Sequence, residues 1–450
     1  MKDLWVLCIA ILVLGCSNQH AAYQAAENKT RVEPQELRRN TGRNTGRKTG
    51  RKTGTTRDKE VTLLDSPAGP GTREAYLTGV NGVVYLSWLE SKATGEDELR
   101  FSKWEGKTWS DPKVIVSSKS LFVNWADFPS IKALSDGSLV AHWLAKSGTG
   151  AYAYDVLVSR STDSGSTWSP PVRPHRDGRK TEHGFVSLID QGSGTFSLVW
   201  LDGRNFQTED DGPTSPRKSN EMTLRFTTFE NGAIRPEVLL DPRVCECCQT
   251  AAVATQDGLF VTYRDRSSEE IRDISFVRYV DGKWTKPKTL YEDGWRIAGC
   301  PVNGPAAAAD GNKLVVAWPT FASDQGRVHA IFSTDGGKTF GDPVRVDLGN
   351  PVGRVDVVWC KDDGGALVSW IEDTDHQTSK IRVRKVWPDG RTDDDFTIAD
   401  TTSGRASGFP RMVCFGSDVL IAWTDSSQPP RVRVAKFSQS GESWARHLPQ

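Results

Sequence analysis

The chain has 450 residues, of which 37% are hydrophobic, and 57 basic residues balance 57 acidic ones. This hydrophobic content excludes a disordered chain, and the zero formal charge excludes the basic surplus typical of nucleic-acid-binding proteins. We therefore expect a folded protein without a nucleic-acid partner. At about 150 residues per domain the length allows three domains, or one large repeat array.

The N-terminus is typical of an exported protein. Lys2 precedes an apolar run from Leu4 to Leu14, which is shorter than the roughly 20 residues of a membrane-spanning helix and matches a signal-peptide core. Val13-Leu14-Gly15-Cys16 resembles the bacterial lipobox, whose cysteine is lipidated. We expect residues 1–15 to be removed and Cys16 to anchor a bacterial cell-envelope lipoprotein, at the outer membrane, with lipid as its only membrane contact. An ordinary signal peptide cleaved nearby is the alternative.

A basic, low-complexity tether is expected over residues 16–60. Between Arg38 and Arg57 it repeats Arg-Asn-Thr-Gly and Arg-Lys-Thr-Gly, with eight basic residues and no acidic ones. Like charges keep such a segment extended, and it has no large apolar side chain with which to build a core. We interpret it as a solvated spacer ahead of the folded part, residues 61–450.

A repeat dominates the folded part. Seven short apolar stretches each follow a glycine-containing turn and end in an aromatic residue: 83–88, 138–143, 196–200, 259–263, 313–318, 366–370 and 419–423. Their closing aromatics are 52 to 63 residues apart, and a unit of about 50 residues with four short strands has the size of a propeller blade. The sequence therefore predicts a monomeric all-β protein, a β-propeller of seven four-stranded blades. Residues 61–65 are expected to add the outer strand of the last blade.

Two segments, 161–168 and 333–340, resemble the Asp-box or BNR repeat, Ser-x-Asp-x-Gly-x-Thr-Trp. Its Asp carboxylate satisfies local backbone donors, so we expect Asp163 and Asp335 to be structural. The motif is typical of sialidase-type propellers, and their six blades make a six-bladed ring the alternative here. The resemblance implies a propeller that acts on a glycan or glycoconjugate. Its more specific implication is an exo-alpha-sialidase type of glycoside hydrolase. A non-catalytic propeller that binds glycan, protein or metal is the alternative.

The candidate catalytic residues lie on loops that a propeller gathers on one face, those joining outer to inner strands and second to third strands. Sialidases hold the substrate carboxylate with three arginines, whose planar forks suit that task. By this resemblance Arg264, Arg354 and Arg411 would form the clamp. The Phe-Arg-Ile-Pro signature of the family's first arginine is absent, and Phe409-Pro410-Arg411-Met412 only echoes it.

Sialidases use a Tyr–Glu pair as nucleophile and base, and an Asp as acid. The resemblance makes Asp127 the candidate acid and Glu246 the candidate base, which needs a neighbouring tyrosine. Asp265 is a further candidate, or else the partner of Arg264 in a loop-stabilising ion pair. No nucleophile is assigned, because Tyr263 occupies a core position. Five more residues on these loops are expected to contact ligand: Trp125, His183, Arg204, Arg266 and Asn303.

Six cysteines remain once the signal and the anchor are set aside, and an even number in an exported protein favours disulfides. Cys360 and Cys414 precede the second-strand tryptophans of neighbouring blades by ten and nine residues, so we expect them to pair. Cys245, Cys247 and Cys248 lie in one inter-blade loop and Cys300 in the next. Bridges within this group are expected, without cofactor or metal; a soft-metal site that also uses His183 is the alternative.

Overall fold

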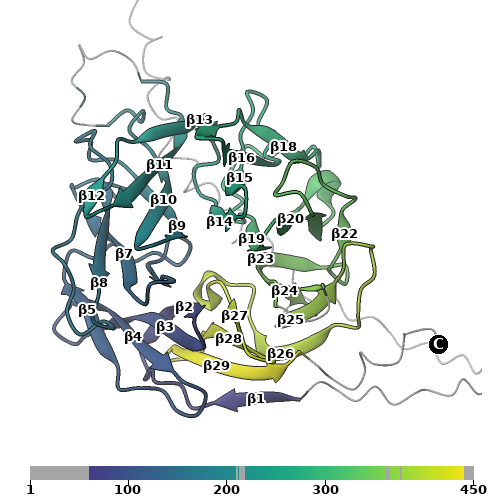
Figure 1. The fold of residues 1–450 in the computed structure, drawn as a ribbon, viewed down its shortest axis with the longest axis horizontal. Coiled ribbons are helices and arrows are strands. Elements are labelled where there is room, and N and C mark those ends of the chain that lie inside the picture. Colours follow the sequence, from purple (N-terminus) through teal and green to yellow (C-terminus); the bar gives the residue numbers. More distant parts are fainter. Residues whose placement is uncertain (1–59, 209–210, 212–217, 361–363, 375–377, 440–450) are drawn as a thin grey trace, which may run out of the picture. The chain divides into compact units, whose positions relative to one another are not determined.

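The structure is a computed structural model that describes residues 60–208, 211, 218–360, 364–374 and 378–439. The expected signal peptide, Cys16 and the tether up to residue 59 lie outside these residues. In the described part, seven antiparallel sheets are arranged around a central axis (Figure 1). The predicted seven-bladed β-propeller is confirmed, and the six-bladed alternative is wrong.

Each sheet follows the chain outward from the axis, and the strands of the first three blades are as follows. Blade 1 contains β2 (Thr72–Val80), β3 (Val83–Ser91), β4 (Asp97–Trp104) and β5 (Lys113–Ser118). Blade 2 contains β6 (Ser130–Ala133), β7 (Leu139–Lys146) and β8 (Tyr154–Ser161). Blade 3 contains β9 (His183–Gly192), β10 (Thr195–Asp202) and β11 (Met222–Glu230), with β12 (Ala233–Ile234) and β13 (Val238–Val244) both paired to β11.

The remaining blades repeat this order. Blade 4 contains β14 (Ala251–Thr255), β15 (Gly258–Arg264), β16 (Ile274–Val280), β17 (Lys283–Trp284) and β18 (Lys288–Tyr291). Blade 5 contains β19 (Ala306–Asp310), β20 (Lys313–Thr320), β21 (Arg327–Ser333) and β22 (Val344–Arg345). Blade 6 contains β23 (Pro351–Val358), β24 (Ala366–Asp373), β25 (Ser379–Val386) and β26 (Phe396–Thr401). Blade 7 contains β27 (Arg411–Phe415), β28 (Asp418–Asp425) and β29 (Arg431–Ser438), and the short 3-10 helices η1 (Ala322–Asp324) and η2 (Arg405–Ser407) lie in loops.

The ring is closed by the N-terminal end of the propeller. Strand β1 (Val61–Leu64) pairs antiparallel with β29 and supplies the outer strand of blade 7. Figure 1 shows these two strands, one from each end of the folded chain, side by side. The expected closing strand is therefore confirmed, and its pairing joins the first and last blades without a covalent link.

The core lies between the blades. The aromatic residues that close the second strands are buried, and Trp88, Trp200, Trp318 and Trp370 are fully so. A second strand is covered on both faces by neighbouring blades, which explains its nearly unbroken apolar pattern. The regular spacing of these aromatics therefore records the blade-to-blade packing.

Blade 2 departs from the expected four strands. The segment expected to be its outer strand, residues 171–174, makes one isolated bridge, between Val172 and Val158. Pro170, Pro171 and Pro174 lack the backbone donors that a continuous ladder requires. The outer edge of this blade is accordingly reduced to a single isolated β-bridge.

The two predicted Asp-box turns use their carboxylates locally. Asp163 accepts hydrogen bonds from the backbone of Ser166 and Thr167 at 3.0 and 2.9 Å, and from the Thr167 hydroxyl at 2.6 Å. Asp335 makes the same three contacts with Lys338 and Thr339. Both aspartates therefore serve the turn rather than a site. No helix in the described part of the chain is long and apolar enough to cross a membrane.

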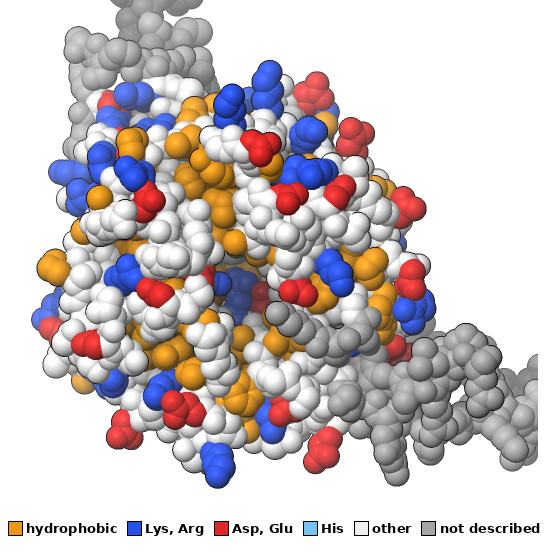
Figure 2. Space-filling view, viewed as in Figure 1, with side chains coloured by type: hydrophobic (Ala, Val, Ile, Leu, Met, Phe, Trp, Pro, Cys, Tyr) orange, Lys and Arg blue, Asp and Glu red, His pale blue; other side chains and the backbone are white. Residues whose placement is uncertain are grey.

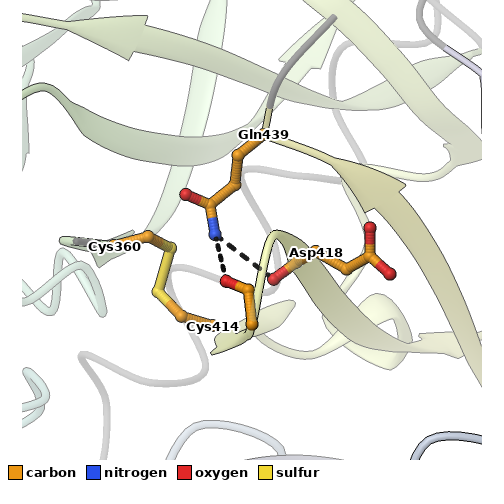
Figure 3. The surroundings of a disulfide bond; sticks show 5 residues. Cys360, Cys414, Asp418 and Gln439 are labelled. Atoms are coloured by element: carbon orange, nitrogen blue, oxygen red, sulfur yellow. Dashed lines mark hydrogen bonds between the residues drawn. A yellow bond between two sulfur atoms is a disulfide. The ribbon is translucent and has the colours of Figure 1, made fainter. Parts of the chain in front are cut away.

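A disulfide joins the inner regions of blades 6 and 7. Cys360 and Cys414 are bonded, as expected, and next to them the Gln439 side chain donates to the carbonyls of Gly416 and Asp418 at 3.1 and 3.4 Å (Figure 3). Because the bridge closes a 54-residue loop, it restricts the unfolded chain as well as the blade interface.

We predict that the Cys360→Ser/Cys414→Ser variant loses about 2–5 kcal/mol of unfolding free energy, because the unfolded chain regains the entropy of that loop. Denaturant unfolding of both proteins, with and without reductant, measures the loss. Reductant should destabilise only the parent protein. Reductant sensitivity that persists in the variant would contradict this prediction, since it would reveal a further bridge.

Candidate functional site

The loops that lead from an outer strand to the next inner strand, called here the inward loops, are tied together around one mouth of the channel. In four places a side chain accepts a hydrogen bond from the backbone of the following blade: Asp127 from Phe185 at 2.7 Å, Gln249 from Gly304 at 3.2 Å, Asn303 from Arg354 at 2.9 Å and Asp356 from Met412 at 2.6 Å. Gln249 also donates to the Ala126 carbonyl at 2.7 Å. The predicted convergence of these loops is thus observed.

Below this mouth the channel holds a small polar cavity of about 160 Å³. Its lining includes Asp127, Lys132, His142, Asp356 and Arg411. Figure 2 shows that the centre of the ring is hollowed and that Lys or Arg atoms lie at the bottom of the hollow. The channel therefore carries charge along its axis rather than being filled by apolar side chains alone.

A tyrosine and two carboxyl groups meet beside this cavity. The Tyr154 hydroxyl lies 2.7 Å from Asp127 Oδ2 and 2.9 Å from Glu182 Oε1. Tyr154 begins β8, and Glu182 directly precedes β9. We call these three residues the carboxyl–tyrosine cluster. Its two carboxyl oxygens are no farther apart than the sum of those two distances.

The cluster must hold a proton. A tyrosine hydroxyl donates one hydrogen bond, so it can serve one carboxylate only, and the other carboxyl group has to donate in return. Burial raises the pKa of Asp127 to about 7, although hydrogen bonds from Tyr154 and Phe185 oppose this. Burial also raises the pKa of Glu182 well above its usual range. Both directions agree with a carboxyl pair that shares a proton at neutral pH.

Local backbone geometry lets Asp127 reach its place. A Cβ atom at Gly184 would lie 1.8 Å from Asp127 Oδ2, so only glycine fits there. Phe185 follows with a φ of 52°, at a β-bulge that turns its backbone donor towards Asp127. The Phe122 ring stacks on Tyr154 with centroids 3.9 Å apart and fixes the phenol from the other side. Asp127 was predicted from the sequence, whereas Tyr154 and Glu182 were not, because their pairing depends on two blades meeting.

The three candidate clamp arginines are already engaged. Arg264 is 1% exposed and donates to the carbonyls of Asn303, Arg272 and Pro319 at 2.8, 2.6 and 2.6 Å. It also stacks on Trp295. All three guanidinium nitrogens thus have backbone acceptors, and Arg264 fixes loops instead of presenting a fork to a ligand.

Arg354 is bound in a similar way. It donates to the carbonyls of Ser403, Gly404 and Gly408 and to the Ser407 hydroxyl. Burial lowers its pKa to about 10. The guanidinium therefore holds the loop around η2 against blade 6.

Arg411 is the least committed of the three arginines. Its Nη1 lies 3.3 Å from Asp356, and its buried Nε has no hydrogen-bond partner among the described residues. The rings of Tyr76, Phe128 and Phe409 surround it. Arg354 and Arg411 approach the same Phe409 ring, at 6.0 and 5.9 Å, whereas Arg264 contacts a different set of residues.

The other candidate catalytic residues have structural contacts. Glu246 pairs with Arg272 at 2.8 Å and lies 3.8 Å from Arg266, which itself binds Glu270 at 2.7 Å. The expected tyrosine partner of Glu246 is replaced by these arginines, and the Tyr–Glu contact forms at Glu182 instead.

Asp265 and Tyr263 also use their side chains in hydrogen bonds to neighbouring residues of the fold. Asp265 accepts hydrogen bonds from the backbone of Arg266 and the hydroxyl of Ser275, and not from Arg264, so the alternative ion pair is not formed. Burial raises the pKa of Asp265 to about 6. Tyr263 is buried and donates to Asp241 at 2.6 Å, in agreement with its expected place in the core.

His183 and Arg204 belong to a buried ionic network between blades 2 and 3. The Nδ1 atom of His183 contacts the carbonyls of Tyr154 and Thr181 at 3.1 Å each, and its Nε2 lies 3.2 Å from Asp177. Both ring nitrogens are occupied, so the proposed site of His183 with cysteine thiolates is not formed. Although burial opposes the charged imidazolium, the Asp177 and Asp202 carboxylates raise the pKa of His183.

Arg204 neutralises the same network, because it contacts Asp202 and Glu237 at 2.6 Å each. The His175 ring stacks on His183 with centroids 3.8 Å apart. The positive charges of Arg204 and the His183 imidazolium thus offset the carboxylates of this cluster.

Trp125 and Asn303 lie at the mouth. The half-buried indole of Trp125 stacks on Phe409 at 5.9 Å and on the Arg354 guanidinium at 5.0 Å. Much of its ring is therefore used in closing the mouth. Asn303 uses its amide to fix the backbone of blade 6, because it also donates to Val352 at 3.2 Å.

The cysteine group on the same mouth contains free thiols. Cys245 Sγ lies 2.8 Å from Cys248 Sγ and 3.8 Å from Cys247 Sγ, and Cys300 is exposed nearby. The bridges expected within this group are not formed in the structure. Burial opposes ionisation of Cys245, but hydrogen bonds from Cys247 and Cys248 and the charge of Arg272 lower its pKa well below the usual value.

The chain matches no protein-family model and no curated protein. Solved structures similar to it include a mutant of the NanB sialidase of Streptococcus pneumoniae, with 11% identity over 84% of this chain and 94% of that one and a TM-score of 0.45. A protein of unknown function from Dyadobacter fermentans has 15% identity over 85% and 98%, with a TM-score of 0.45. The alpha-L-arabinofuranosidase of Fusarium graminearum has 15% identity over 69% and 92%, with a TM-score of 0.44. At this level the similarities carry no argument about the site, which rests on the contacts of this chain.

Proposed function

We propose that the propeller is a glycan-directed glycoside hydrolase whose reacting groups are the carboxyl–tyrosine cluster of Asp127, Tyr154 and Glu182. The observation that supports this is a single hydroxyl within 2.9 Å of two carboxyl groups that have raised pKa values. Glycoside hydrolysis commonly uses two carboxyl groups, one of which is kept protonated by its surroundings. The cluster offers such a pair, joined by a tyrosine hydroxyl, beside the channel mouth.

The three groups of the carboxyl–tyrosine cluster can account for each proton transfer in glycoside hydrolysis. Tyr154 attacks the anomeric carbon and passes its hydroxyl proton to Asp127, while Glu182, whose pKa burial and the charge of Asp127 raise well above its usual range, gives its own proton to the departing glycosidic oxygen. Water then cleaves the glycosyl–tyrosine bond with the same groups acting in reverse. Tyr154 is only 1% exposed, so the mouth must open when substrate binds.

The arginine contacts bear on the choice of substrate. A sialoside carries a carboxylate, which a hydrolase holds with free guanidinium forks. Arg264 and Arg354 have given their donors to backbone carbonyls, and Arg411 faces Asp356. We therefore propose uncharged glycosides as better substrates than sialosides, which narrows the wider sialidase-like expectation.

We predict that Glu182→Gln, Asp127→Asn and Tyr154→Phe each lower turnover by about 10²–10⁴-fold, since they remove the proton donor, the proton acceptor and the nucleophile respectively. The measurement is release of fluorophore by the full chain from a panel of aryl glycosides that includes a sialoside. Glu246→Gln and Tyr152→Phe are the matched controls and should retain activity. Equal turnover by the parent and all three cluster variants would contradict the assignment.

A non-catalytic glycan-binding propeller is the second candidate, because the near-complete burial of Tyr154 favours it. This candidate predicts that the protein binds glycans on an array but hydrolyses none of the aryl glycosides in the panel. In that case neither the parent nor the Glu182→Gln variant would hydrolyse the glycosides, and the substitution would change only glycan binding.

The shared proton gives a separate prediction for stability. The folded pKa of Asp127 is about 7, above its value in the unfolded chain, so the folded state binds the extra proton. Its contribution to stability is complete at low pH and is lost as the pH rises from about 4 to about 7. Relative to Asp127→Asn, the parent should lose a few kcal/mol of unfolding free energy over this window, because the pKa of Asp127 differs by about three between the folded and unfolded states. Denaturant unfolding at several pH values measures the difference, and parallel curves for the two proteins would contradict the raised pKa of Asp127.

We further propose that the chain is exported and lipid-anchored through Cys16 at the outer membrane, as a monomer with a glycan partner. The Val13-Leu14-Gly15-Cys16 segment supports the anchor. Cys16→Ser should move the protein from the membrane to the soluble fraction of the cell envelope, because the lipid is the only membrane contact expected. Fractionation followed by mass analysis of the N-terminus measures this, and an unmodified Cys16 in the parent would refute the anchor.

A further inference from the structure

Three cysteine thiols meet on the inward loop that leads into blade 4. The Sγ atoms of Cys245, Cys247 and Cys248 lie within 4.8 Å of one another. Cys300 is exposed on the next inward loop, which leads into blade 5. Three sulfurs therefore come from four consecutive residues, and the propeller places a fourth cysteine on the adjacent loop of the same mouth.

The contacts are shared among several thiols and do not form exclusive pairs. Cys245 Sγ contacts both Cys247 Sγ, at 3.8 Å, and Cys248 Sγ, at 2.8 Å. Cys360 and Cys414, by contrast, are bonded to each other. Shared contacts of this kind indicate sulfurs that face a common point.

A buried cation supports negative charge at that point. Arg272 is 1% exposed, and its Nη1 lies 3.3 Å from Cys245 Sγ. The same guanidinium is held by Glu246 at 2.8 Å and Glu270 at 3.0 Å. An N–H donor fixed against a thiolate is the kind of outer contact that orients metal ligands.

We propose that Cys245, Cys247, Cys248 and Cys300 form a four-thiolate site for one thiophilic d¹⁰ cation, Zn²⁺ or Cu⁺. Zinc–sulfur bonds of about 2.3 Å in a tetrahedron place sulfurs about 3.8 Å apart, and Cys245 and Cys247 already have a separation of 3.8 Å. Cys245 and Cys248, at 2.8 Å, would move apart by about 1 Å to reach that tetrahedral spacing. This site is independent of the proposed hydrolase function.

The site has a route for the ion. Cys245 and Cys248 are buried, Cys247 is half-buried and Cys300 is exposed, so one side is open to solvent. Binding replaces the thiol protons with the cation and releases them to solvent, and affinity therefore falls as the pH falls. Thiolates select soft or borderline ions over Mg²⁺ and Ca²⁺.

The test uses the full chain, purified without added metal and with reductant, then loaded with Zn²⁺ or Cu⁺ in the presence of a competing chelator. We expect one ion per chain by elemental analysis, protection of four thiols from alkylation, and a thiolate-to-metal charge-transfer band when Co²⁺ replaces Zn²⁺. Cys247→Ser and Cys300→Ser should each weaken affinity by about 100-fold, at or above the effect of losing a second-shell contact. The ion that is retained distinguishes zinc from copper.

Glu246→Gln is the matched control, because it alters the same loop and keeps all four sulfurs. Its affinity should stay within about tenfold of the parent, the lower limit for an outer-contact change. Circular dichroism of each variant separates loss of the site from loss of the fold. The proposal is overturned if protein purified without reductant contains a disulfide among these four cysteines, or if the reduced protein retains no more metal than a Cys245→Ser/Cys247→Ser/Cys300→Ser variant.

Discussion

The structure depends on one recurring interaction, in which a polar side chain at the inner end of one blade accepts a hydrogen bond from the backbone of the next. Asp127, Gln249, Asn303 and Asp356 each do this. The ladders of each sheet lie within one blade, so these inner contacts help to fix the angle between blades. They also place carboxyl and amide groups around the channel mouth, where burial raises the pKa of the carboxyl groups of Asp127 and Asp356.

The burial of the channel mouth explains why charged residues there hold neighbouring loops together. A buried guanidinium must find acceptors, because an unpaired buried charge is costly. Arg264 and Arg354 find them in backbone carbonyls of neighbouring inward loops. Arginine on such a loop can therefore indicate that blades are being held together, as well as that an anion is being bound.

Three of the inner strands begin with a bulge that carries a left-handed residue, namely Glu74, Phe185 and Arg354, with φ values of 57°, 52° and 55°. A bulge re-aims backbone donors and side chains without ending the strand. At Phe185 it supplies the donor for Asp127, and at Arg354 the donor for Asn303. The channel mouth is thus built from the same local irregularity used repeatedly.

The sequence by itself determined what is periodic or local: seven blades from evenly spaced aromatics, the closing strand β1, the turns held by Asp163 and Asp335, and the pairing of Cys360 with Cys414 from equivalent positions in adjacent blades. It also placed Asp127 on an inward loop. Only the tertiary structure decided that the Tyr–Glu contact belongs to Tyr154 and Glu182 and not to Glu246, that His183 faces carboxylates and not thiolates, and that two candidate arginines bind carbonyls. The reason is physical: a repeat is recorded in side-chain patterns along one strand, whereas the partner of a buried charge is set by which loops of different blades meet.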